Sequence, residues 1–190
     1  MLAIGIGLII AQVIFLWLNR EEILKKTNDL GLTSTPEIVN QISDNVSKIA
    51  VDTMLSSGEV EALTNIMILK ACDIALLDKR TIITVNDAIS SLNFICVPFF
   101  WPCAKSNILE NPRITASVIT PSDVNLLESL GITKNDELNA TSATEIANKA
   151  VSYLKNKVPS MDISSHDFDL FNKRIEIWKL QANILSNLNR

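Results

Sequence analysis

Helix-start signals recur along this chain and constrain its fold more than any other feature. A Ser or Thr followed three residues later by Glu or Asp can satisfy free backbone N–H groups in the first turn of a helix. Such signals begin at Ser56, Thr84, Thr120 and Ser142, and a proline follows both Thr35 and Thr120 at the first helical position. We predict helices over about 36–54, 58–78, 84–92, 120–131 and 142–157, and a last one that starts at Ser164 or Ser165.

Strand signals are weak by comparison. Two short β-branched runs, 81–85 and 114–119, could pair as one β-hairpin or strand pair. Only three glycines occur after residue 18, so tight hairpins that depend on glycine are scarce. The fold class we predict is mainly α, with an N-terminal single transmembrane helix followed by a compact multi-helix domain.

The first 18 residues form an uncharged apolar run. Fifteen of them are apolar, and a helix of this length covers about 27 Å, close to the ~30 Å thickness of a bilayer's hydrocarbon core. We therefore predict a transmembrane anchor over 1–18, a polar stalk over 19–35 and a helical domain over 36–190. A cleaved signal sequence is the alternative, although a basic start and small residues before a cleavage site are missing.

Residues within and beside this anchor suggest how it sits in a bilayer. Ala3, Gly7 and Ala11 fall on one helix face, where another helix could approach closely. Trp17 suits the membrane interface, and Arg20 can extend its side chain to the headgroups. Arg20 and two lysines soon after it are basic, whereas no basic side chain precedes the run. This asymmetry predicts a single-pass protein with its C-terminal domain on the cytoplasmic side.

The predicted helix over 58–78 is apolar around most of its circumference. Lys70 and Asp73 interrupt its apolar run, and each would be costly in a bilayer. We therefore interpret this helix as one buried in the core of the domain rather than as a second membrane span.

The last helix carries the clearest apolar period in the chain. A seam with spacings of three and four residues runs along one face, and a second apolar stripe lies beside it. The seam consists of Phe168, Phe171, Ile175, Trp178, Ala182 and Leu185. Either this helix is central and packs on two sides within its own domain, or its second stripe docks a partner chain.

We interpret residues 92–104, LNFICVPFFWPCA, as an apolar loop. Pro98 and Pro102 prevent a regular helix, and the segment is too short to span a bilayer. It can be buried in the core, docked on a partner or inserted into a membrane interface. The residues we predict to contact a partner or a membrane are Phe94, Phe99, Phe100 and Trp101.

Chemistry-bearing residues are sparse. His166 is the only histidine, and the three cysteines, Cys72, Cys96 and Cys103, do not have the spacing of a zinc module. We predict no catalytic residue, no cofactor and no metal. A net charge of −4 and a pI near 5.0 also argue against nucleic acid as a partner.

These observations together favour a non-enzymatic membrane-anchored helical subunit. Its expected partners are the lipid bilayer and other protein subunits of a larger membrane-associated complex, for example a structural protein of a virion or a secretion apparatus. The alternatives are a membrane-bound enzyme that uses a cysteine with His166, and a lipid-contacting protein that acts through residues 92–104.

Overall fold

The computed structural model describes residues 20–53, 55–94 and 118–188. Within these ranges the chain is mainly helical, which confirms the predicted α class. The helices are α2 (Pro36–Thr53), α3 (Ser57–Leu77), α4 (Val85–Leu92), α5 (Pro121–Ser129), α6 (Asn135–Ala140), α7 (Ala143–Lys157) and α8 (Ser165–Leu188). Residues 20–29 are also helical, ahead of α2.

The predicted helix starts coincide with hydrogen-bonded caps. Ser56, Thr84 and Thr120 each form a capping box, in which the hydroxyl accepts from a backbone N–H and a carboxylate three residues later bonds back to the cap. Ser142 accepts from the N–H of Glu145 at 3.2 Å. Ser164 accepts from the N–H of Asp167 at 3.0 Å and so caps α8. Local sequence therefore determines where these helices begin.

Of the helices α2 to α8, only α6 was not predicted from the sequence. It has only six residues, too few to show a helical apolar period. Glu137 supports its start by accepting hydrogen bonds from the backbone N–H groups of Thr133 and Lys134, at 2.7 and 3.1 Å.

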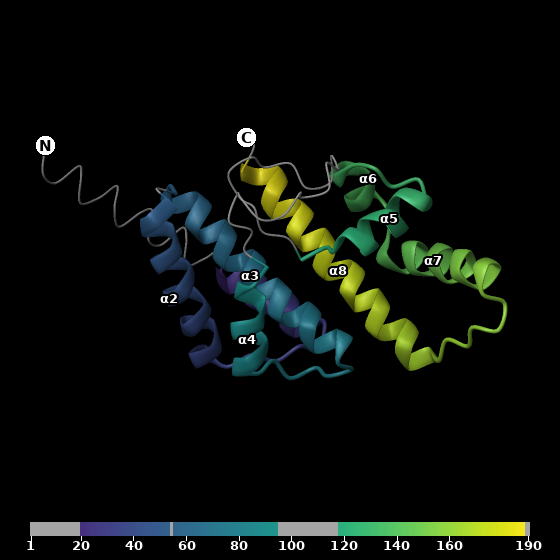
Figure 1. Ribbon diagram of the computed structural model, residues 1–190, viewed down its shortest axis with the longest axis horizontal. Coiled ribbons are helices and arrows are strands. Elements are labelled where there is room, and N and C mark those ends of the chain that lie inside the picture. Colours follow the sequence, from purple (N-terminus) through teal and green to yellow (C-terminus); the bar gives the residue numbers. More distant parts are fainter. Residues whose placement is uncertain (1–19, 54, 95–117, 189–190) are drawn as a thin grey trace, which may run out of the picture.

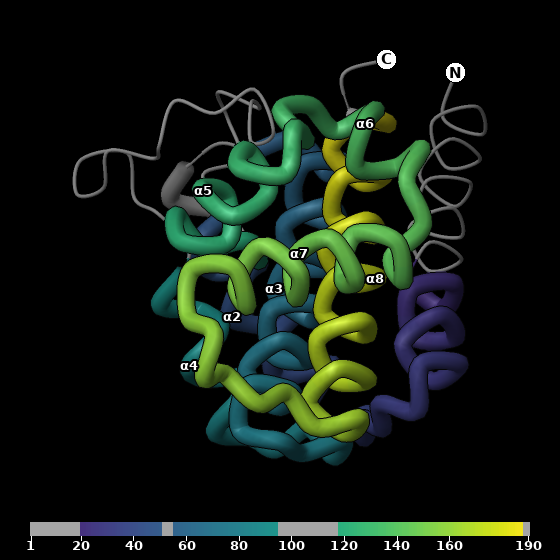
Figure 2. Tube along the Cα trace, turned by 90° about the vertical axis from the view of Figure 1, so that its right-hand side faces the viewer, coloured from purple at the N-terminus to yellow at the C-terminus, as the bar shows by residue number. Residues whose placement is uncertain are grey.

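Two long helices, α3 and α8, pack against each other at the centre of the fold (Figure 1). Helices α2 and α4 cover α3, whereas α6 and α7 pack against α8. Figure 2 shows α7 running across the direction of α3 and α8. The core between these layers is dominated by fully buried side chains of the two central helices, including Ile66, Leu69 and Trp178.

The described residues contain no strand. Ile82 makes one isolated parallel bridge with Thr33, in which the N–H of Ile83 donates to the carbonyl of Thr33 at 2.9 Å. The run 81–85 is too short for a strand because the cap of α4 already begins at Thr84. Of the second predicted run, 114–119, the structure describes only the last two residues, which form a bend.

Residues 20–35 are folded onto the domain rather than forming a polar stalk. Ile23 and Leu32 belong to the hydrophobic core, and Thr27 is buried as well. These residues recur every four to five positions, so one face of the segment 20–29 and the turn after it are covered.

No helix within the described ranges is long and apolar enough to cross a membrane. The anchor predicted over 1–18, with Ala3, Gly7, Ala11 and Trp17, lies outside those ranges. It stays a prediction. Helix α3, the other long apolar stretch, is buried in the domain as its interrupting charges suggested.

Candidate functional site

Four charged side chains meet between α3, α5 and α8. On α3, the ammonium of Lys70 lies 3.2 Å from Asp73 Oδ2, and both side chains are almost fully buried. Arg174 on α8 donates through Nε to Asp73 Oδ1 at 2.7 Å. Its Nη2 lies 3.3 and 3.4 Å from the two carboxylate oxygens of Asp123 on α5. We call these four residues the buried charge network.

The charges of this network balance, with two cations and two anions. Buried ions are tolerated when they are paired and hydrogen-bonded, and are very unfavourable otherwise. Burial alone would lower the pKa of Arg174, but the nearby charges and hydrogen bonds of Asp73 and Asp123 outweigh it and raise that pKa. Arg174 therefore stays charged inside the domain.

Sequence reasoning identified half of this network. Lys70 and Asp73 stood out because they interrupt an apolar helix, and their spacing of three residues puts them on one helix face. Asp123 is marked in the sequence only as the residue three positions after Thr120 in a helix start, and no sequence signal singles out Arg174. A sequence pattern along one helix carries no signal for a partner on another helix.

Lys70 also links the two ends of the segment that lies outside the described residues. Its Nζ donates to the carbonyl of Val118 at 2.8 Å and lies 4.1 Å from the centre of the Phe94 ring. The N–H of Val118 in turn donates to Oε1 of Gln181 on α8. One buried cation thus fixes the chain on both sides of residues 95–117.

Of the predicted contact residues, the structure describes only Phe94. Its side chain is exposed, although its ring contacts Lys70. Phe99, Phe100 and Trp101 lie outside the described ranges, as do Cys96 and Cys103.

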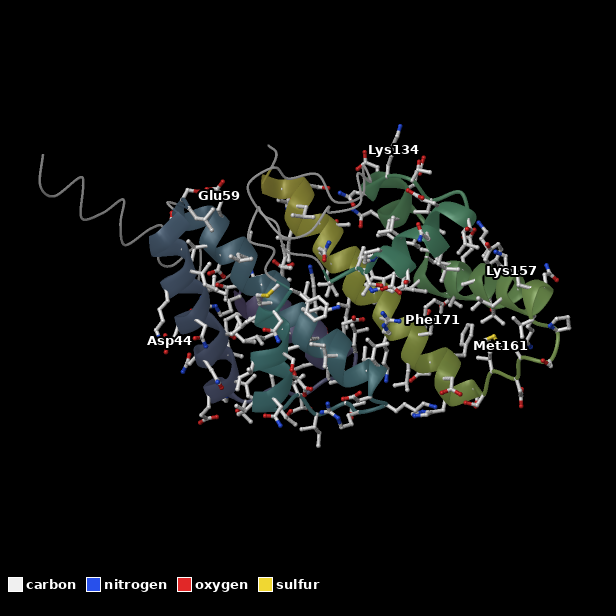
Figure 3. All side chains as sticks on the ribbon, viewed as in Figure 1. Asp44, Glu59, Lys134, Lys157, Met161 and Phe171 are labelled. Carbon is white, nitrogen blue, oxygen red and sulfur yellow. The ribbon has the colours of Figure 1, made fainter. Side chains whose placement is uncertain are left out.

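The predicted seam of the last helix faces the interior. Ile175, Trp178 and Leu185 are buried, and Phe168 and Phe171 are partly buried against the core. Phe171, labelled in Figure 3, meets Trp178 edge to face with ring centres 5.9 Å apart. These contacts favour the interpretation of α8 as a central helix.

The second stripe of α8 is used in the same way. Leu170 and Ile177 are buried, and Ile184 packs against the core from a partly buried position. These side chains of the second stripe therefore pack within the domain itself.

Arg20, which the sequence places beside the predicted anchor, contacts α3 in the structure. Its Nη2 donates to Oε2 of Glu61 on α3 at 3.1 Å, and only 24% of its side chain is exposed. Burial, the largest influence, raises the pKa of Glu61, although the charge of Arg20 and the side chains of Arg20 and Asn65 oppose it. Arg20 is therefore a contact between the segment 20–29 and the core.

Of the residues of the cysteine-dependent alternative, the structure describes Cys72 and His166. Cys72 is buried in α3, and burial together with the charges of Asp73 and Asp87 raises its pKa to about 12. A thiol in this state is a poor nucleophile at neutral pH. His166 lies exposed in the first turn of α8. Among the described residues, no group of three or more His, Cys, Asp or Glu side chains could hold a metal ion.

The fold and this site define a class: a helical domain whose two central helices are joined by a balanced, buried charge network. Comparison with family models, with curated proteins and with solved structures found no match.

Proposed function

We propose that this chain is a non-enzymatic, membrane-anchored helical subunit that joins a larger assembly through its apolar loop, residues 92–104. The observation that carries this proposal is the double contact of Lys70, which holds Phe94 and Val118 at one place on the domain. A loop with a fixed base loses less conformational freedom when it binds than a free chain does.

The composition of the loop supports binding to a protein partner. Phe99, Phe100 and Trp101 follow one another between two prolines. Large aromatic side chains are frequent hot spots of protein interfaces because they bury much area with few rotatable bonds.

The polar interior of the domain supports a binding role over catalysis. The charges of Lys70, Asp73 and Arg174 are paired with one another, and Arg174 also approaches Asp123. A catalytic group needs access to substrate and a free proton or lone pair. Here the buried charges hold helices together instead.

The membrane part of the proposal rests on residues 1–18 of the sequence, which would attach the domain to a bilayer. The basic residues after this run favour the cytoplasmic side for the domain.

Extraction of the full-length protein in a mild detergent tests the proposal. We expect it to leave the membrane in a complex much larger than one chain. Replacing Phe99, Phe100 and Trp101 together by serine should release the single chain. The matched control replaces three exposed apolar side chains elsewhere, Leu77, Ile82 and Ile89, by serine and should leave the complex intact. A wild-type protein that is monomeric and co-purifies with no other chain would refute the proposal.

A further inference from the structure

The segment 20–29 runs alongside α3 and in the same direction. At its start, Nη2 of Arg20 donates to Oε2 of Glu61 in the second turn of α3, at 3.1 Å. After its end, Thr33 forms a parallel bridge with Ile82, five residues beyond the last residue of α3. The start of the segment therefore lies beside the start of α3, and the turn after the segment lies beside the chain that leaves α3.

These contacts distinguish two ends of the domain. We call the end formed by Arg20 and residues 55–60, where α2 ends and α3 begins, the near end (Figure 1). The far end holds Ile82 and also the start of α8, because Lys79 there forms an ion pair with Asp167 at 2.7 Å. Since α3 has 21 residues and a helix rises about 1.5 Å per residue, about 30 Å separate the two ends.

The connection between the predicted membrane anchor and the near end is very short. The anchor is predicted over 1–18 and Arg20 already contacts α3, so Asn19 is the one residue between them. One residue spans at most about 3.6 Å, whereas a free stalk over 19–35 could have spanned about 60 Å. A domain joined in this way cannot stand far from the bilayer that holds its anchor.

The chemistry of the near end suits the surface of a cytoplasmic leaflet. Residues 56–58, in the turn that leads into α3, are exposed and uncharged. The two carboxylates that follow are buried and bonded within the domain, Glu59 to Ser56 and Glu61 in its ion pair. Residues 20–26 carry three basic and two acidic side chains, and anionic headgroups attract such a net positive charge.

We propose that the near end of the domain rests on the bilayer surface and that the short connection through Asn19 and Arg20 holds it there. The far end, with Ile82, then points away from the membrane. This inference rests on the anchor of the proposed function and adds which surface of the domain meets lipid. It does not involve residues 92–104.

Fluorescence quenching by lipid headgroups tests the proposal. The full-length protein is reconstituted into vesicles of phosphatidylcholine and phosphatidylglycerol, with a headgroup spin-labelled lipid in both leaflets. A genetically encoded fluorescent amino acid replaces Ser57 at the near end or Ile82 at the far end, and both positions are exposed. We expect quenching to be several times stronger at position 57 than at position 82, because about 30 Å separate the two ends.

A variant with a longer connection is the matched control. About twenty glycine and serine residues inserted between Asn19 and Arg20 would give the connection a reach of about 25 Å without changing the domain itself. Quenching at position 57 should then fall towards the value at position 82. If it stays as strong as without the insertion, the short connection does not hold the near end on lipid and the proposal is wrong.

The remaining outcomes separate this inference from the proposed function. Equal quenching at the two positions, or stronger quenching at position 82, would overturn the inference if the protein resists alkaline extraction from the vesicles, while the anchor would stand. A protein that alkaline extraction releases would refute the anchor, and the membrane part of the proposed function with it. Neither result bears on whether residues 92–104 bind a partner.

Discussion

Arg174 on α8 donates a 2.7 Å hydrogen bond to Asp73 on α3, although 101 residues separate them in the chain. The same guanidinium lies 5.1 Å from the ring of Trp178 and approaches Asp123 at the start of α5. This single side chain therefore connects the two central helices to the third helix of the network.

Removing the Arg174 cation from its contact with Asp73 should strongly lower the free energy of unfolding. Arg174→Met keeps much of the side-chain volume but leaves Asp73 buried with one partner fewer. We expect a loss of about 3–5 kcal/mol in the free energy of unfolding, because a buried charge loses its compensation. Urea denaturation followed by circular dichroism measures it. Lys149→Ala, which breaks an exposed ion pair with Glu145, is the control and should cost less than about 1 kcal/mol. Equal losses in the two variants would show that Arg174 has no special role.

Lys70→Met should loosen the chain at Phe94. The substitution removes the ammonium that contacts both the Phe94 ring and the Val118 carbonyl. We expect chymotrypsin to cleave after Phe94 at least several times faster than in the wild-type protein.

The matched control for this experiment is Lys179→Met. Lys179 also donates to a backbone carbonyl from a partly buried position, that of Thr141 at the C-cap of α6, at 2.8 Å. If Lys179→Met accelerates cleavage after Phe94 as much as Lys70→Met does, general destabilisation explains the effect and Lys70 is not a clamp.

Cys72 should be inert in the native state. We suggest a protein in which Cys96 and Cys103 are replaced by serine, so that Cys72 is the only thiol. Its pKa of about 12 and its burial predict no labelling by a thiol reagent at pH 8, and complete labelling in denaturant. Rapid labelling of the folded protein would restore the cysteine-dependent enzyme as a candidate.

Asp167 should contribute to the loss of folding stability at low pH. Hydrogen bonds from Lys79 and Ser164 lower its pKa from 3.8 to about 2. Since the folded-state pKa is depressed, the stabilisation is fully present above about pH 4 and disappears as the pH falls towards 2. Asp167→Asn should therefore lower stability at neutral pH and flatten the pH dependence in this window. Thermal unfolding at several pH values measures both effects, and an unchanged acid limb would contradict the assignment.

How far the sequence could predict this fold depends on how far apart along the chain the two partners of each interaction lie. The cap residues Ser56, Thr84 and Thr120 contact backbone only three positions away, so a local pattern was enough to place α3, α4 and α5. The short helix α6 has only six residues, too few for an apolar period to mark it. Arg20 illustrates a different limit, since its partner Glu61 is 41 positions away and only the folded chain reveals the contact.

In the buried charge network, too, the sequence indicated only what depends on residues close together in the chain. Lys70 and Asp73 were conspicuous as charges in an apolar helix, which correctly indicated burial in the core. Their partners on α5 and α8 could not be found from spacing. The contact of Lys70 with both Phe94 and Val118 depends on three separate parts of the chain, and no periodicity predicts it.

The central claim is that the apolar loop held by Lys70 binds another protein. Photocrosslinking in the native membrane tests it most directly, with a photoreactive amino acid placed in turn at positions 99 and 101 and, as a control, at the exposed Val158 after α7. We predict that the two loop positions crosslink to one defined protein species and that the control does not. Crosslinks from the loop that reach only lipid, or only other residues of the same chain, would contradict the account.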